Sequence, residues 1–346
     1  MNLTQLKEVL KGEPNFRFKQ VKKAIFQDLI EDWTKATILP LSLRENLNEK
    51  CPLVINAKLS VSGDDRTAKA LITLKDNLRI ESVLMRHPPR SKNFLLRDKD
   101  ARNTVCVSSQ VGCPLGCMFC ATGKMGFKRN LEALEIVEQV LFFARYLKKL
   151  KEKVTNVVFM GMEEPFLNYD NVLEAIRILN EKDSFCLGAR HFSISTVGII
   201  EGIKKLAKEK LQVNLAISLH APDNDLRSKI MPINKKYSIE KILTAVDEYI
   251  KITRRKVMFE YIMIDNLNDS PSEAKELAKL MKKPLYFVNL ISYNPTGIFH
   301  ASSGDKIKKF KEVLEKAGIP VTQRYRFGKD IKAACGQLAT KSGKQS

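Results

Sequence analysis

The chain has 346 residues, of which 44% are apolar, and its 59 Lys and Arg against 39 Asp and Glu give a net charge of +20. It has no apolar run of about eighteen residues and no apolar signal-peptide core, so we expect neither a transmembrane helix nor secretion. Seven cysteines, an odd number, indicate a reducing cytoplasm and not a disulfide framework. The positive charge favours an RNA partner over a membrane surface, because no segment combines amphipathicity with a lipid anchor.

Residues 1–52 are predicted to form a small helical domain, in which Gly12, Pro14 and Pro40 separate three short helices. The predicted helices are Leu3–Leu10, Lys19–Ile30 and Leu41–Leu47. The run from Phe16 to Lys23 mixes aromatic and cationic side chains. This mixture is typical of a nucleic-acid contact, and equally of core aromatics beside a solvated row of lysines.

Residues 53–100 are predicted to hold a three-stranded β-meander followed by a basic linker. Three segments alternate in polarity and are separated by turn residues: Leu53–Val61, Thr67–Leu74 and Leu78–Met85. Glu81 lies in the third strand, where an acid most often faces solvent. The stretch from Arg86 to Arg102 is polar and basic, and it is either an RNA-contact loop or a linker.

Strands and helices alternate through residues 101–346. The predicted strands are Thr104–Gln110, Val154–Met160, His191–Thr196, Val213–Leu219, Lys256–Met263, Leu285–Ile291 and Pro320–Phe327. The predicted helices are Leu131–Leu150, Tyr169–Glu181, Ile200–Lys210, Ile239–Ile252, Pro271–Lys282 and Asp305–Ala317, with Asn130 as the N-cap of the first and Gly318 as the C-cap of the last. This alternation predicts an α/β fold with parallel strands and right-handed crossovers, and six units suit a partial (β/α)6 barrel.

Several polar residues fall where the predicted strands end, and this is where barrels of this kind carry their chemistry. They are Glu164, Ser195, Ser218, His220 and Asn294. Each of them alone is as readily a cap or a turn residue. Together they predict a pocket for a small polar ligand.

Three cysteines, Cys113, Cys117 and Cys120, follow the first barrel strand at spacings of four and three residues. They are one ligand short of a tetrahedral zinc site, which a distant Cys or His would have to complete. Iron–sulfur clusters of the cubane type take cysteine thiolates, so three of them leave one iron open to another ligand.

This C-x3-C-x2-C motif has an aromatic residue, Phe119, before its last cysteine, which resembles the radical S-adenosylmethionine (SAM) signature. Three further segments limit the resemblance to one family within this group: the run from Cys106 to Cys113, the triplet Ala121-Thr122-Gly123 and the late segment Asp330–Leu338. From about Phe16 to Leu338 the chain resembles the RlmN/Cfr family of radical SAM adenine methyltransferases, which act on RNA.

The resemblance implies a radical SAM barrel behind a helical, RNA-contacting N-terminal domain. It implies one 4Fe-4S cluster on Cys113, Cys117 and Cys120, whose open iron chelates SAM. The implied SAM contacts are Glu163, Glu164, Ser195, Ser218, Leu219, His220 and Asn294, with Glu164 pairing with the ammonium. One position departs from the family, because Glu163 stands where its G-M-G-E-P motif has a glycine.

The resemblance also implies roles for two solitary cysteines and an acid. Cys335 would be methylated by one SAM, and a radical formed from a second SAM would make that methyl group add to the base. Glu81 would then remove a proton, and Cys106 would attack the Cys335 sulfur, leaving a disulfide. Read by itself, Cys335 is as readily a small buried residue, and this is the expectation for Cys51 and Cys186, which match nothing.

The expected reaction is methylation of carbon 2 of an adenine at the peptidyl-transferase centre of 23S rRNA, with an adenine in the tRNA anticodon loop as a second substrate. The alternatives are methylation of carbon 8, which confers antibiotic resistance, and a basic RNA-binding protein with a metal or cluster and no turnover. We expect a monomer that receives single electrons from a reductant such as flavodoxin or ferredoxin. We expect no membrane partner. Basic candidates for RNA contact are Arg324-Tyr325-Arg326, Arg254-Arg255-Lys256 and the segment 86–102.

Overall fold

One ten-stranded sheet organises the described part of the chain, which comprises residues 5–87, 102–324 and 328–340 of a computed structural model. The order of the strands is β1-β2-β3-β4-β7-β8-β9-β10-β11-β12, so sequence neighbours are also neighbours in space. Their bounds are β1 (Ala57–Val61), β2 (Thr67–Thr73), β3 (Arg79–His87), β4 (Arg102–Val107), β7 (Asn156–Phe159), β8 (Phe192–Thr196), β9 (Asn214–Ser218), β10 (Val257–Met263), β11 (Tyr286–Ser292) and β12 (Val321–Gln323).

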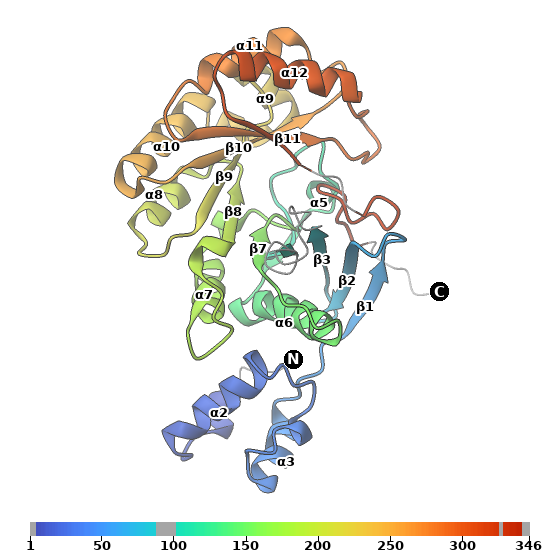
Figure 1. Cartoon of the computed structure of the whole chain (residues 1–346), viewed down its shortest axis with the longest axis vertical. Helices are drawn as coiled ribbons and strands as arrows, with labels where there is room; N and C mark the ends of the chain where they lie inside the picture. The colour runs from blue at the N-terminus through green and yellow to red at the C-terminus, as the bar shows by residue number, and fades with distance from the viewer. Residues whose placement is uncertain (1–4, 88–101, 325–327, 341–346) are drawn as a thin grey trace, which may run out of the picture.

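The strands from β4 to β12 run parallel, as the alternation predicted. The connecting helices lie along the periphery of the sheet (Figure 1). They are α6 (Ala133–Lys149), α7 (Tyr169–Asn180), α8 (Ile200–Lys208), α9 (Asn224–Ile230), α10 (Ile239–Thr253), α11 (Pro271–Leu280) and α12 (Gly304–Lys316). The strands are rich in buried apolar side chains, and both Val157 and Phe159 of β7 are fully buried, as expected of a sheet covered by helices. The six predicted strand–helix units are therefore confirmed.

The ends of the helices follow local capping chemistry. Helix α6 begins after Glu132, which forms a capping box with Glu135, so the prediction that Asn130 caps it is wrong. Asn130 instead ends a short strand and accepts a hydrogen bond from Gln110. Helix α12 is followed by Gly318 with φ +78°, as predicted, because glycine adopts this left-handed conformation without strain.

The predicted meander is present and extends the parallel part of the sheet. β1, β2 and β3 pair antiparallel, and β3 then pairs antiparallel with β4, so that Val83 lies opposite Cys106. The meander is therefore continuous with the barrel strands, and it brings Glu81 of β3 toward the same end of the sheet as the cysteine loop.

The N-terminal helices lie at one end of the molecule, beyond α6 (Figure 1). They are α1 (Leu6–Val9), α2 (Asn15–Phe26) and α3 (Leu41–Lys50), with a 3-10 turn at Trp33–Lys35. The fully buried Trp33 holds them together, and its indole N–H donates to the carbonyl of Cys51 at 2.7 Å. Burial of Cys51 is confirmed, whereas Cys186 is exposed in the loop after α7, so the expectation that it is buried is wrong.

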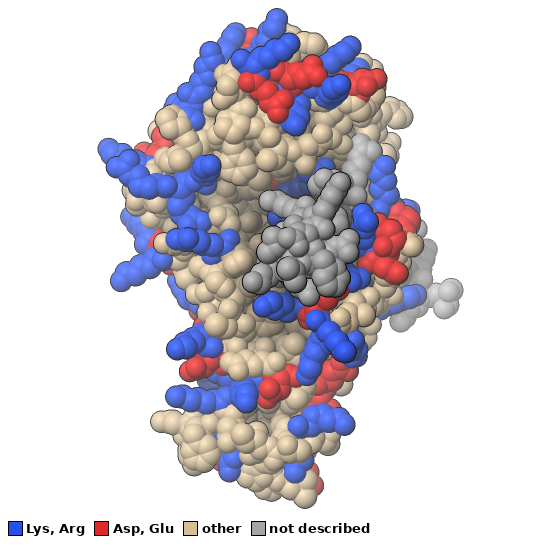
Figure 2. All heavy atoms as spheres, in the orientation of Figure 1, with Lys and Arg blue, Asp and Glu red and all other residues tan. Residues whose placement is uncertain are grey.

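Groups of Lys and Arg side chains are scattered over the visible face, from the helices at the top to those at the N-terminal end, whereas acidic side chains are fewer (Figure 2). Within the described residues, none of the helices has the length and apolar content that a membrane crossing requires.

Candidate active site at the carboxyl ends of the parallel strands

The three clustered cysteines lie on the loop of a small hairpin that the sequence did not predict. The hairpin pairs β5 (Gln110–Gly112) with β6 (Phe127–Asn130), and its loop includes α5 (Ala121–Lys124). The base of the loop is closed by a hydrogen bond from the Cys113 N–H to the Gly126 carbonyl at 3.0 Å. Gly112 has φ +80°, and a Cβ there would lie 1.8 Å from the Gly126 carbonyl oxygen. Only glycine therefore fits this close approach.

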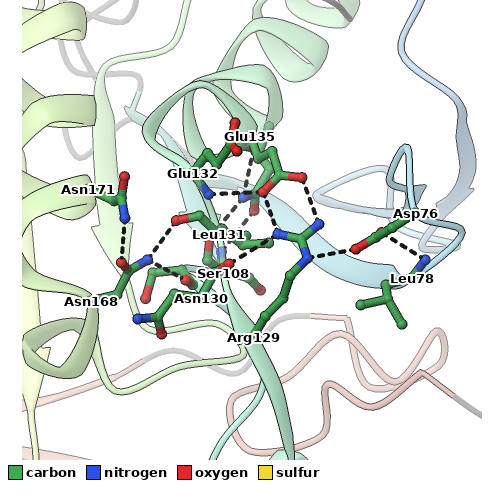
Figure 3. A network of polar contacts seen from close by, with 12 residues as sticks. Asp76, Leu78, Ser108, Arg129, Asn130, Leu131, Glu132, Glu135, Asn168 and Asn171 are labelled. Carbon is green, nitrogen blue, oxygen red and sulfur yellow. Dashed lines mark hydrogen bonds and ion pairs between the residues drawn. The ribbon is translucent and has the colours of Figure 1, made fainter. Parts of the chain in front are cut away.

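A network of polar contacts fixes the hairpin to the meander and to α6 (Figure 3). The guanidinium of Arg129 in β6 lies between two carboxylates, with 2.6 Å to Asp76 of the turn after β2 and 2.7 Å to Glu135 of α6. The amide of Asn168 donates to the carbonyl of Leu131, just after β6. Because contacts reach the hairpin from three sides, the cysteine loop is carried by a rigid base.

The thiols of the loop are enclosed and close to one another. Cys113 and Cys117 are each 8% exposed, and Cys120 is half-buried. Burial raises the pKa of Cys113 to about 12, and burial and the two neighbouring thiols raise that of Cys117. No group of three His, Cys, Asp or Glu side chains in the described ranges has the arrangement of a single-ion site. Three free soft donors on one loop, two of them buried and one half-buried, fit an iron–sulfur cluster, whose positive iron stabilises the thiolate form.

The C-terminal segment lies directly on the cysteine loop. The Ala121 N–H donates to the Gly336 carbonyl at 2.8 Å, and the Thr122 hydroxyl donates to the Leu338 carbonyl at 2.6 Å. The side-chain amide of Asn294, after β11, donates to the carbonyl of Cys335 at 3.1 Å. These contacts hold Cys335 over the loop although more than 200 residues separate the two in sequence.

Cys335 and Cys106 both lie at the end of the sheet that carries the cysteine loop. Cys106 in β4 is buried, and burial, the charge of Glu163 and the charge of Cys335 raise its pKa. Cys335 has an exposed surface, so the reading of it as a small buried residue is wrong, yet desolvation of its thiol raises its pKa to about 11. The positive charge of Arg324 opposes the rise in pKa at both thiols.

Glu81 is buried and ion-paired, contrary to the expectation that an acid in this strand faces solvent. Its carboxylate lies 2.9 Å from the ammonium of Lys69 and accepts a 3.0 Å hydrogen bond from the Ala339 N–H. Leu71, Arg79, Glu81, Ala339 and Thr340 line a cavity of about 230 Å³. Lys69 was not predicted, although it stands two residues from Leu71, the strand partner of Glu81.

The two adjacent acids of the Gly161–Pro165 segment have different surroundings. Glu164 is 1% exposed, and both its oxygens accept backbone N–H groups, one from Phe166 at 3.1 Å and one from Val197 at 2.9 Å. Burial raises its pKa to about 7. Glu163 accepts from the Gly161 N–H at 3.1 Å through one oxygen, while the other is buried without a hydrogen-bond partner. Burial raises the pKa of Glu163 as well.

Ser195 of β8 and Ser218 of β9 meet at a buried acid that the sequence analysis missed. This acid is Glu260 of β10, which accepts from the Ser195 hydroxyl at 2.6 Å and from the Ser218 hydroxyl at 3.4 Å. Its second oxygen pairs with Arg324 at 2.6 Å. A single charge in the apolar run Val257–Met263 was the available signal, because an isolated acid in a buried strand requires a partner.

The other predicted ligand contacts also lie at this end of the sheet. His220, after β9, accepts the Ile262 N–H through Nδ1 at 3.1 Å and packs edge-on against Phe119 of the cysteine loop. Burial lowers the pKa of His220 to about 3, so the neutral ring carries its proton on Nε2. Leu219 is fully buried with its backbone N–H donated to the Glu260 carbonyl, and Asn294 has a buried Oδ1 without a hydrogen-bond partner.

The basic segments expected to contact RNA lie in different parts of the chain, and not all of them are described. Residues 88–101 and 325–327 lie outside the described residues, which removes most of the 86–102 segment and two of the three residues from Arg324 to Arg326. Arg324 itself pairs with Glu260, and its side chain is 27% exposed. The run from Arg254 to Lys256 precedes β10, so it lies at the opposite end of that strand from the site.

A comparison with known families and proteins agrees with this geometry. A family model described as the radical SAM superfamily matches residues 107–281. The "Probable dual-specificity RNA methyltransferase RlmN" of Dictyoglomus turgidum is 45% identical over 340 residues, which are 97% of this chain and 94% of that protein. The "Ribosomal RNA large subunit methyltransferase N" of Nitrosopumilus maritimus is 44% identical over 333 residues, covering 95% and 93%. The crystal structure of a radical SAM methyltransferase from Sphaerobacter thermophilus superposes with a TM-score of 0.90 at 43% identity, covering 98% and 97%.

Proposed function

Because the chain belongs to the RlmN family of radical SAM RNA methyltransferases, we propose that it methylates carbon 2 of an adenine at the peptidyl-transferase centre of 23S rRNA. An adenine in the tRNA anticodon loop is the second substrate in this proposal. The observation that carries it is the position of the C-terminal segment with Cys335, which the hydrogen bonds from Ala121, Thr122 and Asn294 hold on the loop of clustered cysteines.

The enzyme uses a 4Fe-4S cluster and SAM, as members of the radical SAM superfamily do. Cys113, Cys117 and Cys120 would hold the cluster, because they are the three enclosed thiols on the hairpin loop. Together the bound cofactors supply a carbon-centred radical that reaches unreactive C–H bonds, which acid–base groups of the protein alone cannot do. The protein contributes orientation of the reactants and exclusion of water.

SAM would bind where unsatisfied acceptors face the cysteine loop. We assign its ammonium to Glu163, since this carboxylate keeps one oxygen without a partner, while Glu164 is occupied by the N–H groups of Phe166 and Val197. This changes the expectation that Glu164 itself pairs with the ammonium. Asn294 Oδ1 and the Nε2 proton of His220 would receive the polar groups of the ribose and carboxylate. Ser195, Ser218 and the backbone of Leu219 would shape the same wall.

The solitary cysteines and Glu81 would share the transfer of the methyl group. Cys335 carries the methyl group to the base, and Glu81 removes a proton once the base is attached to the protein. The Cys106 thiolate then attacks the Cys335 sulfur, the bond between that sulfur and the transferred carbon breaks, and this carbon takes up a proton to become the methyl group of the product. A disulfide remains that a reductant must open. Arg324 supports the thiolate form at both sulfurs, because its positive charge opposes the effect of burial on their pKa values.

RNA binding is supported by charge and by the surface of the N-terminal helices. The net charge is +20, and cations are scattered over the visible face from one end of the molecule to the other (Figure 2). On α2, Phe16 is 52% exposed and the Arg17 guanidinium lies 4.9 Å from its ring centroid, while Lys19 and Lys23 are exposed. An aromatic ring among cations suits stacking on a base and contact with phosphates. The proposal also includes that the enzyme is cytoplasmic and monomeric and that it receives electrons from flavodoxin or ferredoxin.

The experiment is mass spectrometry of nucleosides from 23S rRNA and tRNA of cells that lack their own enzyme of this family and express this chain. We expect 2-methyladenosine in both RNAs. An 8-methyladenosine product would assign the antibiotic-resistance activity instead, and methylation of rRNA alone would restrict the substrate range. RNA without any new methyl group would contradict the proposal.

A further inference from the structure

Arg227 is a completely buried cation at the end of the barrel that holds the candidate site. It lies on α9, the short helix after β9, and none of its surface is exposed. Its Nε donates to the Leu219 carbonyl, one terminal nitrogen donates to Asn234 Oδ1 and the Tyr237 carbonyl, and the other donates to the Val197 and Ser218 carbonyls. The distances range from 2.6 to 3.3 Å.

These contacts saturate the guanidinium without neutralising it. An arginine has five N–H donors, and all five are engaged here, so Arg227 has none left for SAM or for RNA. Every acceptor is a neutral amide oxygen, and burial lowers the pKa of Arg227 to about 10. A buried charge without a counter-charge is costly, and proteins retain such groups where an anion is held nearby.

The helix that carries Arg227 lies against the cysteine loop. The Nε of Arg227 donates to the carbonyl of Leu219, the residue before His220, at 3.1 Å. The Met118 N–H, next to Cys117, donates to the carbonyl of Ile230 at the end of α9 at 3.0 Å. Across the loop, Phe119 packs on His220, whose pKa the charge of Arg227 also lowers. The helix therefore holds a fixed positive charge against the cluster site.

We propose that Arg227 sets the reduction potential of the cluster, as a buried positive charge that stabilises the reduced state. One-electron reduction adds one negative charge to the cluster, so a fixed cation favours the reduced over the oxidised form and raises the potential. Such charges act strongly in an interior of low dielectric constant. Arg227 is then a positioning residue with an electrostatic role, and the inference rests on the proposed ligation by Cys113, Cys117 and Cys120.

The test is a redox titration of the full chain, reconstituted with iron and sulfide without oxygen and followed by electron paramagnetic resonance, in the absence of SAM and RNA. Dithionite supplies the electrons. In Arg227→Gln the charge and most hydrogen bonds are lost, whereas Arg227→Lys keeps the charge with fewer bonds. Asn234→Asp keeps the acceptor oxygen, which lies 2.8 Å from the guanidinium, and pairs Arg227 with a carboxylate.

We expect the ratio of reduced to oxidised cluster at a fixed applied potential to fall at least about tenfold in Arg227→Gln and in Asn234→Asp, equivalent to about 59 mV for one electron. Arg227→Lys should stay near the parent. Arg145→Gln is the matched control, because Arg145 in α6 is also a buried cation, and it donates to the Leu53 carbonyl far from the loop. This control should lower the melting temperature and leave the potential unchanged.

If Arg227 is only a structural tether, its two variants lose stability together and the potentials of all the variants coincide, which would overturn the inference. Asn234→Asp keeps the test decisive if Arg227→Gln does not fold, since an unchanged potential in that variant alone contradicts an electrostatic role. Failure of the parent to bind iron contradicts the proposed cluster site. A cluster with an unaltered potential in every variant leaves the proposed function intact and removes only this role of Arg227.

Discussion

The Glu81 carboxylate accepts a hydrogen bond from the Ala339 N–H at 3.0 Å, which joins β3 to the C-terminal segment four residues after Cys335. The ammonium of Lys69 lies 2.9 Å from the other oxygen and also donates to the carbonyl of Lys332 at 3.3 Å. Two sites on the C-terminal segment are thus tied to the meander, one before Cys335 and one after it. The acid proposed as the base and the proposed methyl carrier are held by one set of contacts.

Replacing Glu81 separates the proposed proton transfer from the earlier steps. Glu81→Gln keeps the size of the side chain but cannot accept the proton, so methylation of RNA should fall at least about 100-fold while Cys335 is still methylated. The measurements are methyl incorporation into RNA and mass spectrometry of the Cys335 peptide. Glu152→Gln, which loses the ion pair with Arg86, is the control and should keep its activity. Equal activity of the two variants would remove Glu81 from the mechanism.

The three loop cysteines should be required for iron. Cys117→Ala removes one of the three soft ligands, so we expect no stable cluster and no cleavage of SAM under reduction. Iron analysis and the release of 5′-deoxyadenosine measure the two effects. Cys186→Ala changes an exposed thiol in the loop after α7 and should match the parent. A Cys117→Ala protein with full iron content and activity would show that the ligands are assigned wrongly.

RNA affinity should fall steeply with salt, because the net charge of +20 binds phosphates by releasing counterions. For roughly six phosphate contacts, affinity should drop about 10³-fold between about 50 and 200 mM salt. Lys19→Ala on α2 should reduce the slope, whereas Lys279→Ala on α11, which removes a cation paired with Glu276, should not. A flat salt dependence would argue against an electrostatic interface.

Acid should destabilise the iron-free chain through His220. Its pKa is lowered from 6.5 to about 3 in the fold, so the unfolded chain gains a proton first as pH falls below 6.5. The contribution of His220 to the free energy of unfolding is therefore fully present above pH 6.5, and it falls by up to about 1.4 kcal/mol per pH unit below that value. His220→Asn, which suits the φ of +62°, should flatten this loss in urea unfolding, and exposed His300→Asn should not. If the parent and His220→Asn lose stability equally as the pH falls, His220 is already charged in the folded state.

The periodic part of the fold could be predicted from the sequence, and local departures from periodicity could not. Strands such as Val257–Met263 and helices such as Ile239–Thr253 match their predicted positions to within one or two residues, because long apolar patterns determine them. The β5–β6 hairpin and α9 were missed, because each is short and its conformation depends on contacts such as that between Gly112 and Gly126.

The site was predictable where a motif or a strand end identified it. The cysteine spacing and the strand-end positions of Ser195 and His220 predicted residues that the fold brings to one end of the sheet. Glu260, Lys69 and Arg227 were missed, because their importance depends on which charges the fold brings beside them. Arg324 was assigned to RNA from its basic neighbours, whereas in the fold it pairs with Glu260. Pairing of buried charges depends on tertiary contacts that one sequence does not reveal.

The most direct test of the two-cysteine account is the fate of Cys106→Ala purified from cells and run on a denaturing gel with and without ribonuclease. The variant lacks the thiolate that attacks the Cys335 sulfur, so we predict a persistent protein–RNA adduct on Cys335, whereas Cys335→Ala should carry neither adduct nor methyl group. Absence of an adduct on Cys106→Ala, together with no methyl group on Cys335 of the parent, would contradict the account and favour a basic cluster-binding protein without turnover.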